Sequence, residues 1–108
     1  MAMDLPKLRK LVSLDENDPL SRFALGRKLA EEGTDEALRE AATHLRFANE
    51  RAPSHLATYH VLGQVLIRIG EKDEARRVLE EGIRRVGGIG EGMGRDLGPL
   101  MRQMLESI

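Results

Sequence analysis

The chain has 108 residues, with 17 basic and 18 acidic side chains and a formal net charge of −1. This balance provides no general attraction to nucleic acid or to an anionic membrane surface, so neither is predicted as a partner. The absence of cysteine excludes disulfides and thiolate metal sites. No stretch approaches the ~20 apolar residues of a membrane span, and the first residues do not resemble a leader. We therefore expect one soluble, cytoplasmic domain.

The first half of the chain predicts three helices. The first is expected from about Leu5 to Leu14, and its residues Leu5, Leu8, Leu11 and Val12 should lie on one side. Asp18 and Pro19 form a typical helix start, and Gly33 is a typical left-handed stop, so a second helix is expected between them. A third helix should follow over residues 34–51, opened by a cap at Thr34.

The second half predicts three more helices. Ser54 is expected to cap a helix that reaches Ile69 and ends at Gly70. Several β-branched residues in this segment also suit a strand, but the segment is too long for an ordinary one. A fifth helix is predicted over residues 72–86, and a glycine-rich linker over 88–94. The last helix, within 95–108, should be amphipathic, with apolar residues at Leu97, Leu100, Met101, Met104, Leu105 and Ile108.

Two stretches of the chain repeat one another. Leu25-Gly26, Leu29 and Gly33 recur as Leu62-Gly63, Leu66 and Gly70, and Ala41 and Leu45 recur as Ala75 and Leu79. Repeats of this length are typical of helical arrays, in which each unit covers an apolar face of its neighbour. Gly26 and Gly63 are expected where the two helices of a hairpin cross, because helix axes ~8–10 Å apart need small residues there.

The spacing Tyr59-x2-Leu62-Gly63-x2-Leu66, followed by Gly70, Ala75 and Leu79, resembles the tetratricopeptide repeat, and residues 19–53 resemble a second copy. The resemblance implies an all-α fold, an array of antiparallel αα-hairpins. Its parts would be a flanking helix at 1–18, repeats at 19–53 and 54–87, and a capping helix at 95–108. The pattern departs from the family at Arg22, where a large aromatic residue is preferred, and at Gly82, where alanine is usual.

Two polar stripes are candidates for a binding surface. On the fourth helix, His60, Gln64 and Arg68 follow one another at intervals of four, and Phe23, Arg27 and Glu31 occupy the equivalent positions on the second helix. The family resemblance implies that these six residues line a concave groove for a segment of a partner protein. A solvated stripe without a ligand is the competing interpretation. If the groove is used, the cationic residues favour a carboxylate beside an apolar side chain.

Three roles are open for the terminal helix. It would cover the fifth helix as a cap, or lie in the groove of its own chain, or dock on a second copy. The last role predicts a homodimer through residues that share the apolar face, namely Leu97, Leu100, Met101, Met104 and Leu105. A structural protein that self-associates in this way is the alternative to the binding module.

The sequence contains no recognisable catalytic set, and no cofactor is predicted. His44, His55 and His60 lack the spacing that would bring two of them to one metal ion. The glycine run follows a helix and lacks the pattern of a phosphate-binding loop. The prediction is therefore a protein-binding module and not an enzyme.

Overall fold

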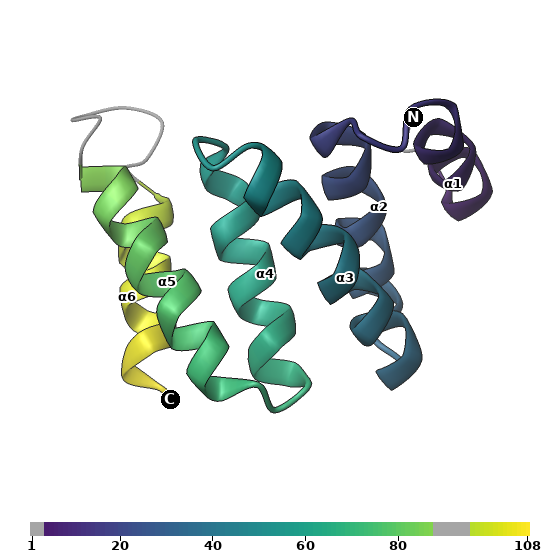
Figure 1. Ribbon diagram of the computed structural model, residues 1–108. Coiled ribbons are helices and arrows are strands. Elements are labelled where there is room, and N and C mark those ends of the chain that lie inside the picture. Colours follow the sequence, from purple (N-terminus) through teal and green to yellow (C-terminus); the bar gives the residue numbers. More distant parts are fainter. Residues whose placement is uncertain (1–3, 88–95) are drawn as a thin grey trace. The chain divides into compact units, whose positions relative to one another are not determined.

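The computed structural model describes residues 4–87 and 96–108, and within them the chain forms six helices and no strand. The bounds are α1 Leu5–Leu14, α2 Pro19–Glu32, α3 Asp35–Arg51, α4 Leu56–Arg68, α5 Lys72–Gly87 and α6 Leu97–Glu106 (Figure 1). The prediction of an all-helical fold is confirmed, including a helix in the segment with strand-like composition. The predicted linker at 88–94 lies outside the described residues.

The first three helices begin at side-chain caps. The side chain of Asp4 accepts a hydrogen bond from the backbone N–H of Lys7, Asp18 accepts from Leu20, and Thr34 accepts from Ala37. Each cap satisfies one backbone donor that has no partner inside its helix. The predicted starts of the second and third helices are thus confirmed.

The start of α4 differs from the prediction, because the N-cap position belongs to His55 and not to Ser54. Pro53 and Ser54 form an exposed turn that precedes the helix. The ring nitrogen Nδ1 of His55 lies 2.8 Å from Oγ1 of Thr58, so the imidazole contacts a side chain of the first turn instead of a backbone amide. A serine before a helix was a reasonable signal, but the tight turn after proline delays the helix by one residue.

Glycines end α2 and the segment after α4. Gly33 has φ +77° at the C-cap of α2, and Gly70 has φ +85° just after α4. At the second site the N–H of Glu71 donates to the carbonyl of Leu66 at 2.8 Å, which satisfies one of the last carbonyls of the helix. Both stops were predicted from sequence, because this left-handed conformation is strained for any residue with a Cβ atom.

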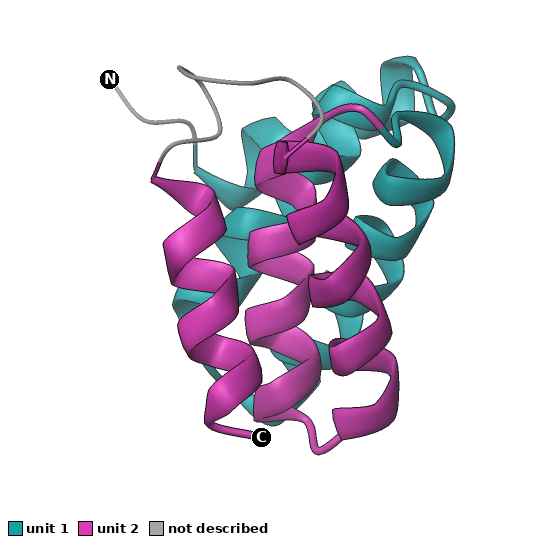
Figure 2. Cartoon of the chain, turned by 90° about the vertical axis from the view of Figure 1, so that its left-hand side faces the viewer, with its two compact units in different colours: residues 1–53 teal, residues 54–108 magenta. Residues whose placement is uncertain are grey.

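The chain divides into two compact units, Met1–Pro53 and Ser54–Ile108, coloured separately in Figure 2. In the first unit α2 packs against both α1 and α3. The core is formed by apolar residues from all three helices, namely Leu8, Val12, Leu25, Leu29, Leu38, Ala41, Ala42, Leu45 and Ala48. Leu11 was expected on the buried side of α1 but is exposed, because α2 covers only the narrow stripe that contains Leu8 and Val12.

Gly26 lies where α2 crosses α3. A Cβ atom added to Gly26 would be 2.7 Å from Cγ of Leu45 and 3.3 Å from the carbonyl oxygen of Ala41. Carbon atoms in contact are normally about 3.5–4.0 Å apart, so the crossing has no room for a larger residue. The structure therefore places Gly26 and Ala41 at the crossing that the repeat spacing predicted.

The second unit contains the equivalent crossing and a third helix. A Cβ atom on Gly63 of α4 would be 2.5 Å from Cδ2 of Leu79 on α5. The helix α6 packs against both α4 and α5 (Figure 2). Its residue Met101 is 0% exposed and joins Tyr59 and Leu79 in one buried cluster. The terminal helix thus covers both helices of its own hairpin.

Gly82 explains how α6 packs so closely. A Cβ atom at this position of α5 would be 2.7 Å from both Sδ of Met101 and Cβ of Tyr59. The departure from the alanine that the repeat pattern prefers is therefore a notch at the junction of three helices. It makes space for the methionine of α6.

Candidate binding faces of α2 and α4

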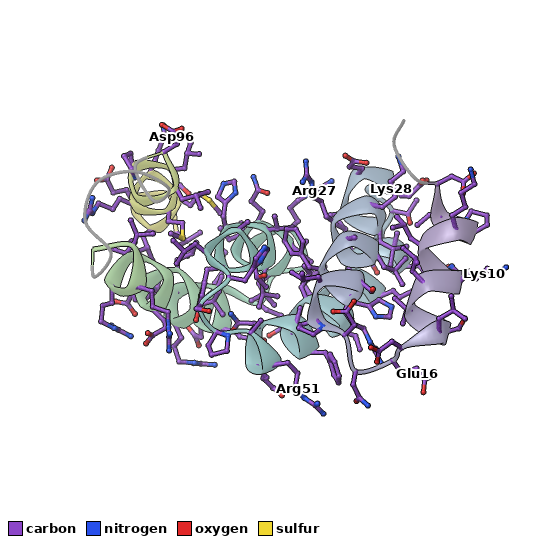
Figure 3. The ribbon with its side chains drawn as sticks, turned by 90° about the horizontal axis from the view of Figure 1, so that it is seen from above. Lys10, Glu16, Arg27, Lys28, Arg51 and Asp96 are labelled. Carbon is purple, nitrogen blue, oxygen red and sulfur yellow. The ribbon has the colours of Figure 1, made fainter. Side chains whose placement is uncertain are left out.

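The first candidate face lies on α2, opposite the residues that α2 buries. Leu25, Gly26 and Leu29 face the core, and the stripe of Phe23, Arg27 and Glu31 lies about half a turn away. Arg27 is exposed and projects away from the helix (Figure 3). Phe23 is half-buried, and the exposed Glu31 accepts from Nζ of Lys28 at 3.3 Å.

The second candidate face lies on α4 and has the same register. Leu62, Gly63 and Leu66 are buried, whereas Gln64 and Arg68 are exposed on the other side of the helix. His60 is half-buried, and burial lowers the pKa of its imidazole, so the ring is neutral at pH 7. The face therefore offers an amide, a neutral imidazole and one cation.

The structure brings the six predicted site residues together as two triplets. One triplet belongs to a helix of the first unit and the other to a helix of the second unit. Within each triplet the residues form one stripe along the helix, as the spacing predicted. On the side opposite each stripe, the helix packs closely against the next helix at a glycine, Gly26 in α2 and Gly63 in α4.

The helix α6 packs next to the face of α4. Ile67 follows Gln64 by three residues, so the two share neighbouring positions on the helix surface. Ile67 packs against the cluster that contains Met101. One edge of the face of α4 therefore adjoins the buried cluster to which α4, α5 and α6 all contribute.

A polar network in the first unit was not predicted from sequence. The guanidinium of Arg9 on α1 donates to both carboxylate oxygens of Glu40 on α3, at 2.6 and 3.1 Å. Nε2 of His44 lies 3.3 Å from Oε2 of Glu40, and Nδ1 of His44 lies 3.3 Å from a guanidinium nitrogen of Arg22 on α2. The network therefore connects all three helices of the unit.

The network determines the tautomer of His44. An arginine guanidinium can only donate, so Nδ1 accepts from Arg22 and carries no proton. In a neutral ring the proton is then on Nε2, which donates to Glu40. Burial lowers the pKa of His44 more than the neighbouring Glu40 raises it, in agreement with a neutral ring.

Arg22 also explains a departure from the repeat pattern. Its guanidinium lies over the ring of Phe47 with Cζ 4.3 Å from the ring centroid, and Arg51 lies over the same ring at 4.7 Å. Nε of Arg22 donates to the carbonyl of Glu16. The flat guanidinium thus stacks on an aromatic ring and additionally binds polar groups.

We expect acidification to destabilise the first unit through this network. The folded state lowers the pKa of His44 by burial, and it lowers the pKa of Glu40 chiefly through the hydrogen bond from Arg9. The unfolded chain then binds more protons, so stability present at pH 7.5 is lost as pH falls below about 6.5, and further below about 4.5. Urea unfolding at several pH values measures this loss.

The control for this experiment is His44→Gln, with His60→Gln as its counterpart in the second unit. The pKa of His60 is also lowered by burial, so both histidines contribute in the same direction. The double variant should lose most of the pH dependence between about 7 and 5 and keep the part due to Glu40. An unchanged profile in the double variant would contradict the assignment.

A shallow cleft of about 220 Å3 lies beside the network in the first unit. It is lined by residues of α1, α2 and α3 and by Thr34, and its acidic residues are Glu32, Glu36 and Glu40. Glu40 is already paired with Arg9. The cleft is smaller than the usual 300–1,000 Å3 of a small-molecule site, so we do not assign it a ligand.

None of the helices that the structure describes combines the length and apolar character needed to cross a bilayer. In the described ranges 4–87 and 96–108, no three histidine, aspartate or glutamate side chains are grouped as metal ligands would be.

Comparison with known proteins finds neither a protein-family model nor a curated protein that matches this chain. The similarity to the tetratricopeptide repeat therefore depends on the residue spacing and on the two glycine crossings.

Proposed function

We propose that the chain is a protein-binding module that holds a peptide segment of a partner on the polar faces of α2 and α4. The proposal includes the arrangement of the two hairpins as a tetratricopeptide-like array in the cytoplasm. In that family the corresponding faces line a concave groove.

One observation carries the proposal: the two hairpins use the same construction. In each, the first helix packs a glycine against the second helix, and the opposite side of the first helix is a polar stripe. Arg27 of one stripe and Gln64 of the other are exposed at equivalent positions. A repeated hairpin that presents equivalent residues is suited to bind an extended ligand at several points.

The composition of the stripes defines the expected partner. Arg27 and Arg68 favour a carboxylate, and the half-buried Phe23 offers apolar surface. The neutral His60 adds a hydrogen-bonding group that carries no charge at pH 7. We therefore expect a segment that contains acidic side chains next to large apolar ones.

A panel of fluorescent peptides tests the proposal by anisotropy. Peptides that alternate acidic and large apolar residues should bind with dissociation constants of roughly 1–100 μM, and peptides with lysine at the acidic positions should not. The variant Arg27→Glu with Gln64→Glu should weaken binding by about tenfold or more. It reverses or adds charge at exposed sites without disturbing the core.

The matched control is Arg77→Glu, an exposed arginine on α5 outside both faces. This variant changes the net charge by −2, against −3 for the double variant (−2 at Arg27 and −1 at Gln64), and should bind the peptides as the parent does. Equal loss of binding in both variants would show a general charge effect, and equal retention would remove these faces from the binding site.

The alternative, self-association through α6, receives less support. Met101 is fully buried, and Leu97, Met104 and Leu105 pack against the cluster around it. Of the residues predicted for that homodimer, Leu100 is exposed, at 43%. A dimer of this kind would therefore require α6 to leave its own hairpin.

A further inference from the structure

Of the three residues that form the face of α4, only His60 can change its charge near neutral pH. The unperturbed pKa of a histidine is about 6.5, whereas the amide of Gln64 does not titrate and the guanidinium of Arg68 stays charged. Any proton that this face gains or loses near pH 7 therefore belongs to His60.

The imidazole of His60 is half-buried and has no hydrogen-bond partner in the part of the chain that the structure describes. Among the described residues, the buried side-chain polar atom without a partner is Nδ2 of Asn49, so both ring nitrogens of His60 reach the surface. The ring has lost part of its hydration without gaining a partner in the protein. A ligand that approaches the face of α4 can therefore bind to these nitrogens.

The helices that pack against α4 add no charge to this ring. Burial is the only cause of the lowered pKa of His60, so no charged side chain acts on the imidazole. On α5, Arg85 lies over the ring of Tyr59 at 6.0 Å, and α6 carries Arg102 and Glu106, which are both exposed. The buried side of α5 is uncharged and is formed by Ala75, Leu79 and Gly82.

His60 and Gln64 are placed to bind one carboxylate together. They are four residues apart on α4, so their Cβ atoms are neighbours at about 5–6 Å on the helix surface. Gln64 is exposed and its amide carries two N–H donors. A carboxylate above this pair can accept from the amide and from a ring nitrogen of His60.

Building on the proposed function, we propose that the acidic segment binds the face of α4 together with a proton, which is taken up by His60. The imidazolium and the amide of Gln64 then donate to the same carboxylate. A hydrogen bond from a charged donor to a carboxylate is about twice as strong as one between neutral groups. Acidification therefore tightens binding.

The direction of this pH effect follows from the two states of the ring. In the free chain, burial holds the pKa of His60 below its ordinary value. In the complex, a carboxylate at hydrogen-bond distance favours the charged ring and raises that pKa. Affinity rises as pH falls between the pKa of the complex and the pKa of the free chain. The carboxylates of the segment, with pKa values of about 4, stay ionised in this range.

Anisotropy titrations at about pH 7.5 and about pH 5.5, with the acidic and apolar peptides described above, test the proposal. The dissociation constant of the parent should fall about tenfold at the lower pH, which corresponds to a pKa difference of about one unit. Circular dichroism at each pH checks that the chain is folded. Calorimetric titrations at about pH 6.5, in two buffers of different ionisation enthalpy, should show uptake of roughly half a proton per peptide.

The variant His60→Gln keeps an amide donor but cannot take up a proton, so its dissociation constant should be the same at both pH values. The matched control is His44→Gln, the same substitution at a half-buried histidine whose ring nitrogens already contact Arg22 and Glu40. This control should keep the pH effect of the parent. Peptides with glutamine at the acidic positions should lose it.

Three results would overturn the proposal. The first is an affinity of the parent that stays constant or falls on acidification, and the second is a pH effect that persists in His60→Gln. Both leave the proposed function intact, because that function requires only binding at about pH 7.5. The third is a peptide panel that binds at neither pH, which overturns the proposed function and the proton uptake together.

Discussion

Gly63→Leu should destabilise the second unit by about 3 kcal/mol. Even a Cβ atom at this position would be 2.5 Å from Cδ2 and 2.9 Å from Cγ of Leu79, which is fully buried. The two helices must separate or Leu79 must leave its rotamer, and overpacking of this kind costs about 1–3 kcal/mol or more. Thermal unfolding followed by circular dichroism should show a midpoint lowered by more than about 10 °C.

The control is Gly87→Ala, at the end of α5. A Cβ atom at Gly87 meets nothing within 4 Å, so the added methyl group should be tolerated. Alanine also has a higher helix propensity than glycine, so stability should stay the same or rise slightly. If Gly63→Leu unfolded at the same midpoint temperature as Gly87→Ala, the close packing of α4 against α5 at Gly63 would be contradicted.

Met101→Ala should destabilise the second unit by about 2–4 kcal/mol. Met101 is 0% exposed and lies between Tyr59, Leu79 and the notch at Gly82. Truncation removes its contacts and leaves a cavity between three helices, and both effects lower the free energy of unfolding. Urea unfolding monitored by circular dichroism measures the change.

The neighbouring residue supplies the comparison for this prediction. Leu100→Ala removes an apolar side chain from the same helix, but Leu100 is 43% exposed and should cost less than about 1 kcal/mol. Similar losses for both variants would mean that α6 does not dock through Met101. A larger loss for Met101 would also disfavour a dimer in which this residue contacts a second copy.

Together these experiments separate stability from binding. The crossings at Gly26 and Gly63 and the buried Met101 hold the helices, and their variants should unfold more easily. Arg27 and Gln64 lie on exposed faces, and their variants should remain as stable as the parent. Loss of peptide binding without loss of stability is therefore the result that would assign function to the two faces.

The helices and their crossings could be predicted from sequence because their signals are local. Asp18 with Pro19 starts α2, Gly33 ends it, and Gly26 occurs at the position where the repeat pattern places a crossing. Capping and left-handed stops depend on a few consecutive residues. The two stripes of candidate site residues follow from helical periodicity in the same way.

Other features depend on residues that are distant in sequence. The network that joins Arg9, Glu40, His44 and Arg22 brings together three helices, and no spacing in the sequence indicates it. In the sequence Arg22 is only a departure from the repeat pattern, because its stacking partner Phe47 is on another helix. Side-chain pairs of this kind arise only after helices pack, so sequence periodicity does not contain them.

The sequence by itself determined that the chain is helical, where most helices begin and end, and which glycines allow close packing. The tertiary structure decided that α6 docks on its own hairpin through Met101 and that Leu11 and Leu14 stay exposed. The physical reason is that an amphipathic pattern shows which side of a helix will be buried but not which other element will bury it. For α6 the partner surface lies at Gly82 of α5, where the missing side chain leaves space for Met101.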